Sequence, residues 1–471
     1  MHPHSISYFS RREMLRRAGC GFGSLAFGSM FSQLALSAHA VGSSPLAAKQ
    51  PPAPARAKRV IFLFMHGGPS AVDTFDHKPL LTRDHGKPMP TRAGDLIAPN
   101  SKLLGSPWEF SAHGKSGLEI SAAFPEVAKH ADDLCLIRSM HTDGQAHGQA
   151  VLKLHTGHET QVRPSMGSWI IYGLGTDNQN LPGFVTISPS IFNGGPQNYG
   201  PAFLPAIYQG TPIGSDNIPL SQAQIRHIKN AELSPELQRK QLDLIQEMNR
   251  EHLRQAAADA QLEGVIESYE LAFRMQTEAP KLTDITDESE ATLQLYGINQ
   301  TPTDNFGRQC LLARRFAEKG VRFVQVNHAF KWDQHVNLKR DLERNAREVD
   351  QPIAALLTDL KQRGLLKDTL VIWGGEFGRT PTAQGNMDGR DHNPHGFTMW
   401  LAGGGAKPGF SYGATDDYGY RAVENKVHMH DLHATILHLL GLDHKQLTYR
   451  YAGRDYRLTD VKGNVAKEIL S

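Results

Sequence analysis

Five short apolar runs along the chain have the length of buried strands. The first of them ends at Met65 and is followed by His66 and two glycines. A run that stays apolar without alternating is typical of a strand that is covered on both faces of a parallel sheet. The five runs are Arg59–Met65, Leu134–Ile137, Arg322–Val326, Thr369–Trp373 and Thr398–Ala402.

Helical patterns separate several of these runs. Residues 306–319 precede the third run and residues 340–363 precede the fourth. This alternation predicts an α/β fold with a mostly parallel sheet flanked by helices. Residues 221–294, rich in Gln, Glu, Leu and Ala, interrupt the alternation and indicate a helical insertion of two or three helices, which is either a solvated flap or a lid over a site. A last helical pattern begins near His430, with Asp431 as its expected cap.

Residues 1–40 have the features of a twin-arginine signal peptide. Arg11 and Arg12 precede a weakly apolar stretch without carboxylates, and small residues flank a cleavage position after Ala40. An amphipathic N-terminal helix is the alternative. Residues 41–58, rich in Pro and Ala, are expected to form a disordered linker before a domain at 59–471. We therefore expect the twin-arginine export machinery as a partner, a periplasmic or secreted location, and no transmembrane segment after cleavage.

Composition narrows the chemistry that the chain can support. The formal net charge is +2, which provides no electrostatic case for binding nucleic acid. The sequence has 3 cysteines, one of them within the predicted signal, so it indicates neither a disulfide framework nor a cysteine metal site. Its 23 histidines direct attention to sites built from imidazole and carboxylate groups.

Imidazole and carboxylate groups adjoin all five apolar runs. Ligands of open parallel sheets bind beyond the carboxyl ends of the strands, where loops bring distant residues together. A divalent ion needs such ligands from several loops to complete its coordination. We therefore expect these groups to converge. The candidates are His66 with Asp73, the segment from Ser139 to His147, Asp333 with His335, Glu376, and His392 with His395.

A series of ordered motifs makes the chain resemble a known family. Through them it is identified as a member of the twin-arginine-exported bacterial proteins called DUF1501, in the forms abundant in planctomycetes. The motifs span nearly all of the chain after the signal. They are His66–Ser70 with Asp73–Asp76, Arg138–Thr142, Arg163–Ser168, Trp332–His335, Gly375–Pro381, Gly389–His392 and His430–His433.

That family is similar in architecture to the alkaline phosphatase, sulfatase and phosphoglycerate mutase superfamily, in which two divalent ions flank an esterified nucleophile. By this resemblance Asp333, His335 and one of His392 and His395 hold one ion. Glu376 stands where a second-site aspartate is usual. Three such side chains suffice for Zn²⁺ or Mn²⁺ with a position left for water or substrate, and Ca²⁺ and Mg²⁺ are further options. His66 and Asp73 are additional candidate metal ligands.

The sequence departs from the superfamily pattern where the nucleophile is expected. Counting back from the helix end at Leu154–Gly157 places His147 at the nucleophile position, and Phe377 stands where a second metal ligand is expected. His147 is therefore a metal ligand, a nucleophile that forms a phosphoramidate, or a structural residue. The hydroxyl groups near this position belong to Ser70, Ser139 and Thr142.

Two further side chains are expected to assist the site. Arg379 either binds a phosphate or sulfate oxygen or orients Glu376 as its ion-pair partner. Asp391 is expected to orient the imidazole of His392, as carboxylates do for metal-bound histidines. The glycine pairs 67–68 and 374–375 either let the backbone approach an anion or end strands for packing reasons.

These observations lead to two hypotheses of different classes. The first is an exported metal-dependent hydrolase of a phosphate or sulfate ester on a small molecule or glycan. Its expected catalytic residues are His147, Glu376 and Arg379, with Glu376 or His147 as general base or further ligand. The second is a non-catalytic binding or scaffold protein of the cell envelope, which the missing nucleophile and Phe377 favour.

Overall fold

A nine-stranded sheet forms the centre of the described chain. The computed structural model describes residues 44–471, except residues 91–96, 99, 224–232 and 256–259. The predicted signal peptide, residues 1–40, lies outside the described residues. In spatial order the strands are β12 (Phe410–Tyr412), β4 (Leu134–His141), β11 (Phe397–Ala402), β8 (Thr369–Gly374), β1 (Arg59–Met65), β7 (Phe323–His328), β5 (Phe184–Ile187) and β6 (Thr211–Ile213), with β15 (Val427–His428) beside β4.

The described strands of this sheet run parallel except for β11. β1 pairs in parallel with β7 and β8, and β5 pairs in parallel with β6 and β7. β11 runs antiparallel to both of its neighbours, β4 and β8. The start of β11 therefore lies at the edge where the parallel strands end, and the segment before β11 reaches the same edge. The predicted α/β class with a mostly parallel sheet is confirmed.

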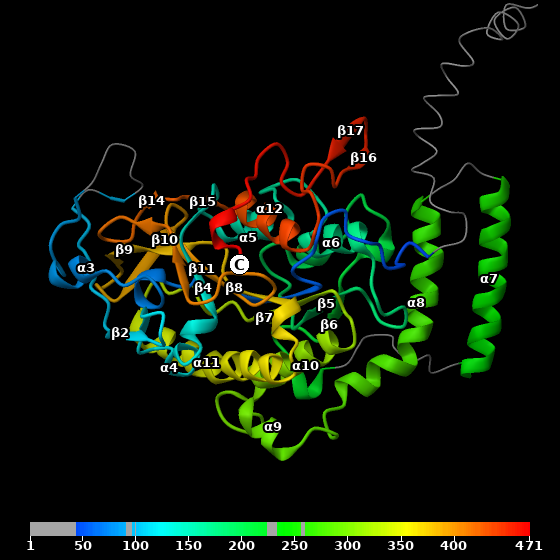
Figure 1. The fold of residues 1–471 in the computed structure, drawn as a ribbon, viewed down its shortest axis with the longest axis horizontal. Coiled ribbons are helices and arrows are strands. Elements are labelled where there is room, and N and C mark those ends of the chain that lie inside the picture. Colours follow the sequence, from blue (N-terminus) through cyan, green and yellow to red (C-terminus); the bar gives the residue numbers. More distant parts are fainter. Residues whose placement is uncertain (1–43, 91–96, 99, 224–232, 256–259) are drawn as a thin grey trace, which may run out of the picture. The chain divides into compact units, whose positions relative to one another are not determined.

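Helices cover both faces of the sheet (Figure 1). α5 (His147–Thr156), α6 (Met166–Leu174) and α12 (Met429–Leu439) lie on one face, and α4 (Pro125–Ala128), α10 (Asp304–Glu318) and α11 (Leu338–Gln362) lie on the other. Because of this cover, every residue of β1 after Arg59 is buried. The helices predicted at 306–319 and 340–363 correspond to α10 and α11.

The sequence pattern did not predict β5, β6, β12 and β15. Each has four residues or fewer, and β6 contains Pro212, a residue that edge strands tolerate. Strands this short contribute little periodicity, so no pattern could reveal them. The smaller elements outside the sheet are α3 (Pro79–Arg83), β2 (Phe110–His113), β3 (Leu118–Ser121), β9 (Gly378–Gln384), β10 (Gly389–Asn393), β13 (Ala414–Thr415), β14 (Ala422–Glu424), β16 (Tyr449–Tyr451) and β17 (Arg454–Tyr456).

The predicted insertion is helical where the structure describes it. It contains α7 (Pro235–Gln255), α8 (Ala260–Thr283) and α9 (Glu290–Leu295). Arg239 on α7 makes a two-pronged ion pair with Glu270 on α8, at 2.8 and 2.6 Å. Arg274 of α8 donates to the carbonyl of Gln179 in the main domain at 2.9 Å.

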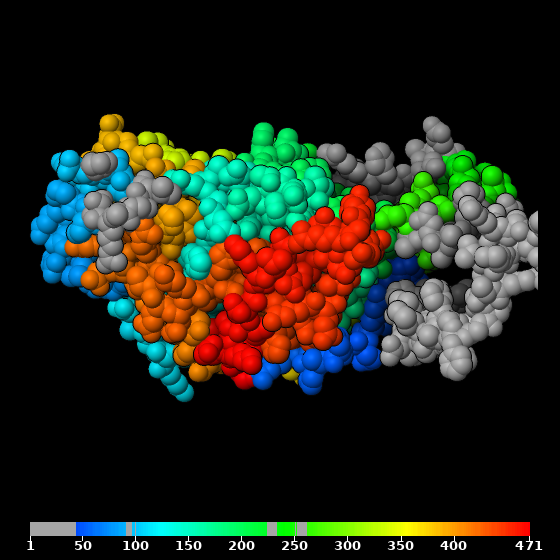
Figure 2. Space-filling model, turned by 90° about the horizontal axis from the view of Figure 1, so that it is seen from above, coloured from blue at the N-terminus to red at the C-terminus, as the bar shows by residue number. Residues whose placement is uncertain are grey.

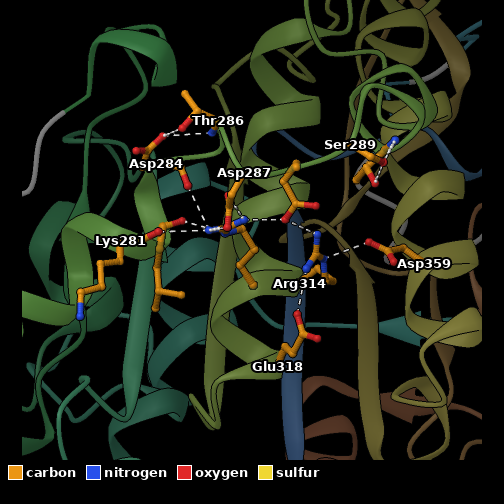
Figure 3. Close-up of polar contacts among 12 residues, drawn as sticks. Lys281, Asp284, Thr286, Asp287, Ser289, Arg314, Glu318 and Asp359 are labelled. Carbon is orange, nitrogen blue, oxygen red and sulfur yellow. Dashed lines mark hydrogen bonds and ion pairs between the residues drawn. The ribbon is translucent and has the colours of Figure 1, made fainter.

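Two arginines of α10 form ion pairs with the segment that follows α8 (Figure 3). Arg314 donates to Glu288 at 2.6 Å and to Glu318 at 2.8 Å, and its Nε lies 2.9 Å from Asp359 on α11. Arg315 also donates to Glu288, at 2.6 Å. Arg314 is only 3% exposed, so its charge requires these carboxylates. The network fixes where the insertion rejoins the α/β domain.

The described part of residues 41–58 is not a disordered linker, contrary to the prediction from its composition. The backbone N–H of Ala53 donates to the carbonyl of Gly441 at 3.1 Å, and that of Ala57 donates to Leu439 at 2.9 Å. The side chains of Leu46 and Ala57 are each 1% exposed. Burial of these apolar side chains and the backbone hydrogen bonds hold the segment against the domain.

α12 begins one turn earlier than Asp431 implied. His428 is the N-cap, and its side chain accepts a hydrogen bond from the backbone N–H of His430 at 3.2 Å. Asp431 lies within the first turn and accepts from the backbone N–H of His428 at 2.9 Å. The prediction that Asp431 is the cap was wrong, because the two side chains share the task as a capping box.

The C-terminal part of the chain packs against the segment that contains α5 (Figure 2). His430 Nε2 donates to the carbonyl of Gly157 at 2.8 Å, and His433 Nε2 donates to that of Leu154 at 2.7 Å. These bonds satisfy carbonyl groups at the end of α5 that have no partner within the helix. α12 therefore supports the helix that begins with His147.

Cys135 and Cys310 are buried free thiols. Among the described residues, no helix has both the length and the hydrophobicity that a membrane span requires.

Candidate metal centre

Four side chains from distant parts of the chain converge at the edge where the parallel strands end. His147 is the first residue of α5, Asp333 and His335 lie between β7 and α11, and His392 lies on β10. Each offers one ligand atom, and these atoms all lie within 4.8 Å of one another. His392 was expected in a loop, but it lies on the β9–β10 hairpin, which precedes β11.

Each of the three imidazole rings has its Nδ1 tied to an oxygen acceptor. His147 Nδ1 donates to Glu376 Oε1 at 2.6 Å, and His392 Nδ1 donates to the carbonyl of Gln145 at 2.8 Å. His335 Nδ1 donates to Gln384 Oε1 at 2.5 Å. With the proton on Nδ1, each ring presents the lone pair of Nε2 to the cluster.

The distances between the ligand atoms match the edges of a coordination polyhedron. Asp333 Oδ1 lies 3.1 Å from His147 Nε2, 2.9 Å from His335 Nε2 and 3.3 Å from His392 Nε2. Ligands about 2.0–2.1 Å from a tetrahedral zinc ion are about 3.3 Å apart. His147 Nε2 is buried and faces Asp333 Oδ1. The residues present therefore fit a divalent ion.

Asp333 also binds the guanidinium of Arg379. Arg379 Nη2 donates to Asp333 Oδ1 at 2.7 Å, while its Nε donates to the carbonyl of Gly68 at 3.0 Å and Nη2 also reaches the carbonyl of Gly67. Burial opposes ionisation of Asp333, but the adjacent imidazoles of His147 and His392 and the charge of Arg379 hold its pKa below the usual range. Arg379 thus orients Asp333 rather than Glu376, and it is too deeply buried to reach a substrate.

Glu376 lies behind His147 and outside the cluster. Its two carboxylate oxygens accept the backbone N–H of Gly67 at 3.1 and 3.2 Å, and one of them also accepts from His147. Burial would raise the pKa of Glu376, but the hydrogen bond from His147 and the nearby charge of His66 lower it, so the carboxylate stays ionised. In this place Glu376 fixes the tautomer of His147.

The environment of His147 bears on the three interpretations of this residue. Burial lowers its pKa, but the hydrogen bonds and charges of Asp333 and Glu376 outweigh burial and raise it. Its ring contacts Phe377 at a centroid distance of 4.8 Å and Phe330 at 4.9 Å. With Nδ1 bound to Glu376 and Nε2 facing Asp333, the geometry favours a metal ligand over a nucleophile.

Two candidate ligands lie apart from the cluster. His66 Nε2 accepts from the amide of Asn193 at 3.0 Å, its ring stacks on Phe64, and burial lowers its pKa. Asp73 makes a buried ion pair with Arg390, at 2.7 and 3.0 Å. Asp73 therefore neutralises Arg390 and is not available to the cluster.

Of the three hydroxyl candidates from the sequence, Ser70 and Ser139 donate to acceptors elsewhere in the protein. Ser70 donates to Asp73 at 2.5 Å, and Ser139 donates to the carbonyl of Asn425 at 2.6 Å. Thr142 is buried, and its backbone N–H donates to the carbonyl of Pro394 at 2.9 Å. None of these three described hydroxyl groups belongs to the cluster.

The glycines near the cluster are required by close packing. Gly67 has a φ of 118°, and a Cβ there would lie 2.6 Å from the backbone nitrogen of Asp333. A Cβ at Gly375 would lie 2.5 Å from Pro69 Cδ. The loops after β1, β7 and β8 can meet only because these positions lack side chains.

A polar cavity of about 340 Å³ adjoins the cluster. His392 and Gln384 line it, together with Asp391 and His395. Asp391 accepts the backbone N–H of His392 at 2.8 Å and does not contact its ring, contrary to the expected role. None of the described residues of the helical insertion lines this cavity, so the structure gives no support to a lid.

Sequence reasoning missed Gln145 and Gln384, which hold the rings of His392 and His335. Gln145 acts through its backbone carbonyl, which no residue type signals. Gln384 lies opposite Gly389 in the β9–β10 hairpin, and Arg379 lies opposite His392. The sequence did not predict this hairpin, and only its register brings Gln384 and Arg379 to the cluster.

Solved structures of ester-processing enzymes resemble the chain weakly. The lipoteichoic acid synthase LtaP from Listeria monocytogenes is 9% identical, with 88% of this chain and 78% of that chain covered and a TM-score of 0.36. The PsFucS1 sulfatase from Pseudoalteromonas sp. is 13% identical, with 82% and 68% covered and a TM-score of 0.34. The alkaline phosphatase from the Antarctic bacterium TAB5 is 12% identical, with 77% and 94% covered and a TM-score of 0.30. At these TM-scores the similarity adds nothing to the argument about function.

Sequence comparison gives a clearer result. None of the curated proteins matches this chain. A family profile described as "Protein of unknown function (DUF1501)" matches residues 57–470, almost all of the described chain. The chain belongs to the DUF1501 family, as its ordered motifs predicted.

Proposed function

We propose that this protein is a metal-dependent hydrolase of phosphate or sulfate esters. One observation carries the proposal: three imidazole rings and a carboxylate each offer one ligand atom, these atoms lie within 4.8 Å of one another, and each ring is anchored through Nδ1. Such anchoring of metal-bound histidines by oxygen acceptors is general in metalloenzymes. His147, Asp333, His335 and His392 would hold Zn²⁺ or Mn²⁺.

A bound divalent ion supplies a polarised ester oxygen and a water molecule whose pKa is lowered toward about 7. The chain provides the rest. Glu376 and Gln384 keep the protons of two histidines on Nδ1, and Arg379 holds Asp333 ionised. In the hydrolysis, the oxygen of water bonds to phosphorus or sulfur, the bond to the ester oxygen breaks, and a proton passes to the leaving alcohol.

Asp391 is suited to move that proton. Its side chain is 48% exposed and lines the cavity beside His392. A carboxylate so placed can accept a proton from water and return it to the leaving group. In this arrangement His147, Glu376 and Arg379 act by binding or orienting rather than by attacking the substrate.

We further propose that the reaction takes place outside the cytoplasm. The support is the sequence Arg11-Arg12 followed by a weakly apolar stretch that ends in small residues. A reporter fusion tests this proposal: Arg11→Lys combined with Arg12→Lys should retain the protein in the cytoplasm. Export of the double variant at the normal level would contradict the twin-arginine route.

Metal analysis and an ester assay test the hydrolase proposal together. The purified protein is stripped with a chelator, reloaded with Zn²⁺ or Mn²⁺, and assayed with 4-nitrophenyl phosphate and 4-nitrophenyl sulfate. We expect about one ion per chain and turnover that disappears with the chelator and in His335→Gln. Absence of both metal and turnover would contradict the proposal.

A second candidate function is a non-catalytic envelope scaffold. Phe377 supports it, because its ring packs against His147 and His392 at centroid distances of 4.8 and 4.7 Å, where a second ion's ligand was expected. The same experiment separates the two functions. A bound ion without turnover of any ester would favour the scaffold.

A further inference from the structure

The cavity beside the cluster is lined by neutral polar groups. Its described lining includes the amide residues Gln145 and Gln384 and the hydroxyl residues Thr380, Thr382 and Ser101. These groups donate and accept hydrogen bonds without carrying a charge. A substrate that fills the cavity must therefore offer neutral hydrogen-bonding groups on its organic part.

Positive charge is scarce at this site. None of the described residues that line the cavity is lysine or arginine, and Asp391 is the one acid among them. The guanidinium of Arg379, which binds Asp333, is 1% exposed, and its hydrogen bonds go to Asp333, Arg390 and the glycines at 67 and 68. Among the described lining residues, only the imidazoles of His392 and His395 can pair with a second negative charge, and neither carries the permanent charge of lysine or arginine.

The net charge of the metal-loaded site determines how much negative charge a bound substrate can carry. Asp333 and Glu376 carry two negative charges and Arg379 one positive charge, so a divalent ion leaves one positive charge in excess. Asp391 at the cavity offsets part of it. An uncompensated charge in a partly buried site is costly, and its cost increases steeply with the size of the charge.

We infer that the site takes a singly charged ester whose organic part is neutral and rich in hydroxyl groups, such as a sulfate monoester or a phosphodiester of a sugar. This inference rests on the proposed function and narrows its substrate class. Phosphate monoesters carry close to two negative charges above pH 7, because their second pKa is near 6. Asp391 and the lack of lysine or arginine among the described residues that line the cavity disfavour their binding.

Binding measurements at pH 8 test the charge preference. The metal-loaded protein is titrated by calorimetry with 4-nitrophenyl sulfate, methyl 4-nitrophenyl phosphate and 4-nitrophenyl phosphate. These probes share the aryl group and differ in charge or in the central atom. We expect one or both of the singly charged probes to bind about tenfold more tightly than the doubly charged one. Which of the two binds more tightly distinguishes a sulfate monoester from a phosphodiester.

Asp391→Asn removes the acid of the cavity with little change of shape. This variant should strengthen the binding of the doubly charged probe most. The affinity ratio between the singly and doubly charged probes should therefore decrease several-fold. Asp417→Asn, at an exposed position outside the cavity lining, is the matched control and should leave the preference unchanged. Equal or tighter binding of 4-nitrophenyl phosphate to the natural protein, an unchanged preference in Asp391→Asn, or no binding of any probe would each overturn the inference.

Two sulfate esters test whether the site prefers a substrate whose organic part is rich in hydroxyl groups. Galactose 6-sulfate should bind about tenfold more tightly than ethyl sulfate, and Thr382→Val should remove much of this difference without changing ethyl sulfate binding. Equal binding of the two sulfates would overturn this half of the inference. Turnover of the same esters, measured in parallel, distinguishes the two proposals. If singly charged esters bind preferentially but are not hydrolysed, only the proposed hydrolase function is contradicted. If phosphate monoesters are hydrolysed faster, only the proposed preference for singly charged esters is contradicted.

Discussion

His335 and His392 face each other with their Nε2 atoms 2.9 Å apart, although Nδ1 of each ring already donates to an oxygen acceptor. Two lone pairs at this distance repel unless a cation or a proton lies between them. Asp333 Oδ1 lies beside both nitrogens. The three atoms are thus arranged around a position that favours a positive charge.

His392→Asn should therefore abolish stable metal binding. Asparagine is too short to place a ligand atom at the position of Nε2, and the remaining ligands would come from one helix and one loop. Metal stoichiometry, measured by mass spectrometry after dialysis, should decrease from about one ion per chain to near zero.

His395→Asn is the matched control for that variant. His395 follows the same strand and lines the same cavity, but it lies outside the cluster. It should retain the ion. Loss of metal in both variants, or retention in both, would contradict the assignment of His392.

Glu376→Gln should weaken metal binding by about 10- to 100-fold, the usual effect of removing a carboxylate behind a metal-bound histidine. Glutamine keeps the shape but lacks the negative charge that raises the basicity of His147. Competition with a fluorescent chelator measures the affinity. An affinity equal to that of the natural protein would show that Glu376 has only a packing role.

Gly67→Ala should destabilise the domain and disturb the cluster. The added Cβ would lie 2.6 Å from the backbone nitrogen of Asp333, and the residue would keep a φ of 118° that alanine rarely adopts. Gly86→Ala is the control, because Gly86 has a φ of 80° but no atom within 4 Å of its Cβ position. Urea unfolding should show a loss at least about 2 kcal/mol larger for Gly67→Ala than for Gly86→Ala.

Acid should destabilise the protein through His433. Burial lowers the pKa of this fully buried imidazole to about 3 from its ordinary 6.5. Below pH 6.5 the imidazole binds a proton in the unfolded state but stays neutral in the folded state. The contribution of His433 to the free energy of unfolding is therefore complete above pH 6.5 and is lost as the pH falls toward 3. His433→Gln should make the free energy of unfolding less dependent on pH in this window.

Urea unfolding between pH 4 and 7 measures that dependence. Glutamine can still donate to the carbonyl of Leu154, as His433 Nε2 does. His438→Gln is the comparison on the same helix, because His438 is exposed. If the pH dependence of His433→Gln equalled that of the natural protein, His433 would not be a source of acid sensitivity.

The sequence by itself determined the fold class and most of the ligands. The apolar runs at Arg59–Met65 and Thr369–Trp373 are long enough to show that both of their faces are covered, and this requires a sheet between helices. The topology of a parallel sheet then brings the ends of its strands to one edge, so Asp333 and His335 could be assigned from their place after an apolar run.

Only the tertiary structure decided which of the remaining candidates belong to the cluster. His392 and His395 are equivalent in sequence, but the pleat and the bulge of the β9–β10 hairpin turn only His392 toward Asp333. Asp73 looked like a ligand until its buried partner Arg390 was placed, 317 residues away along the chain. Pairing between such distant residues depends on packing in three dimensions, which leaves no periodic signal in the sequence.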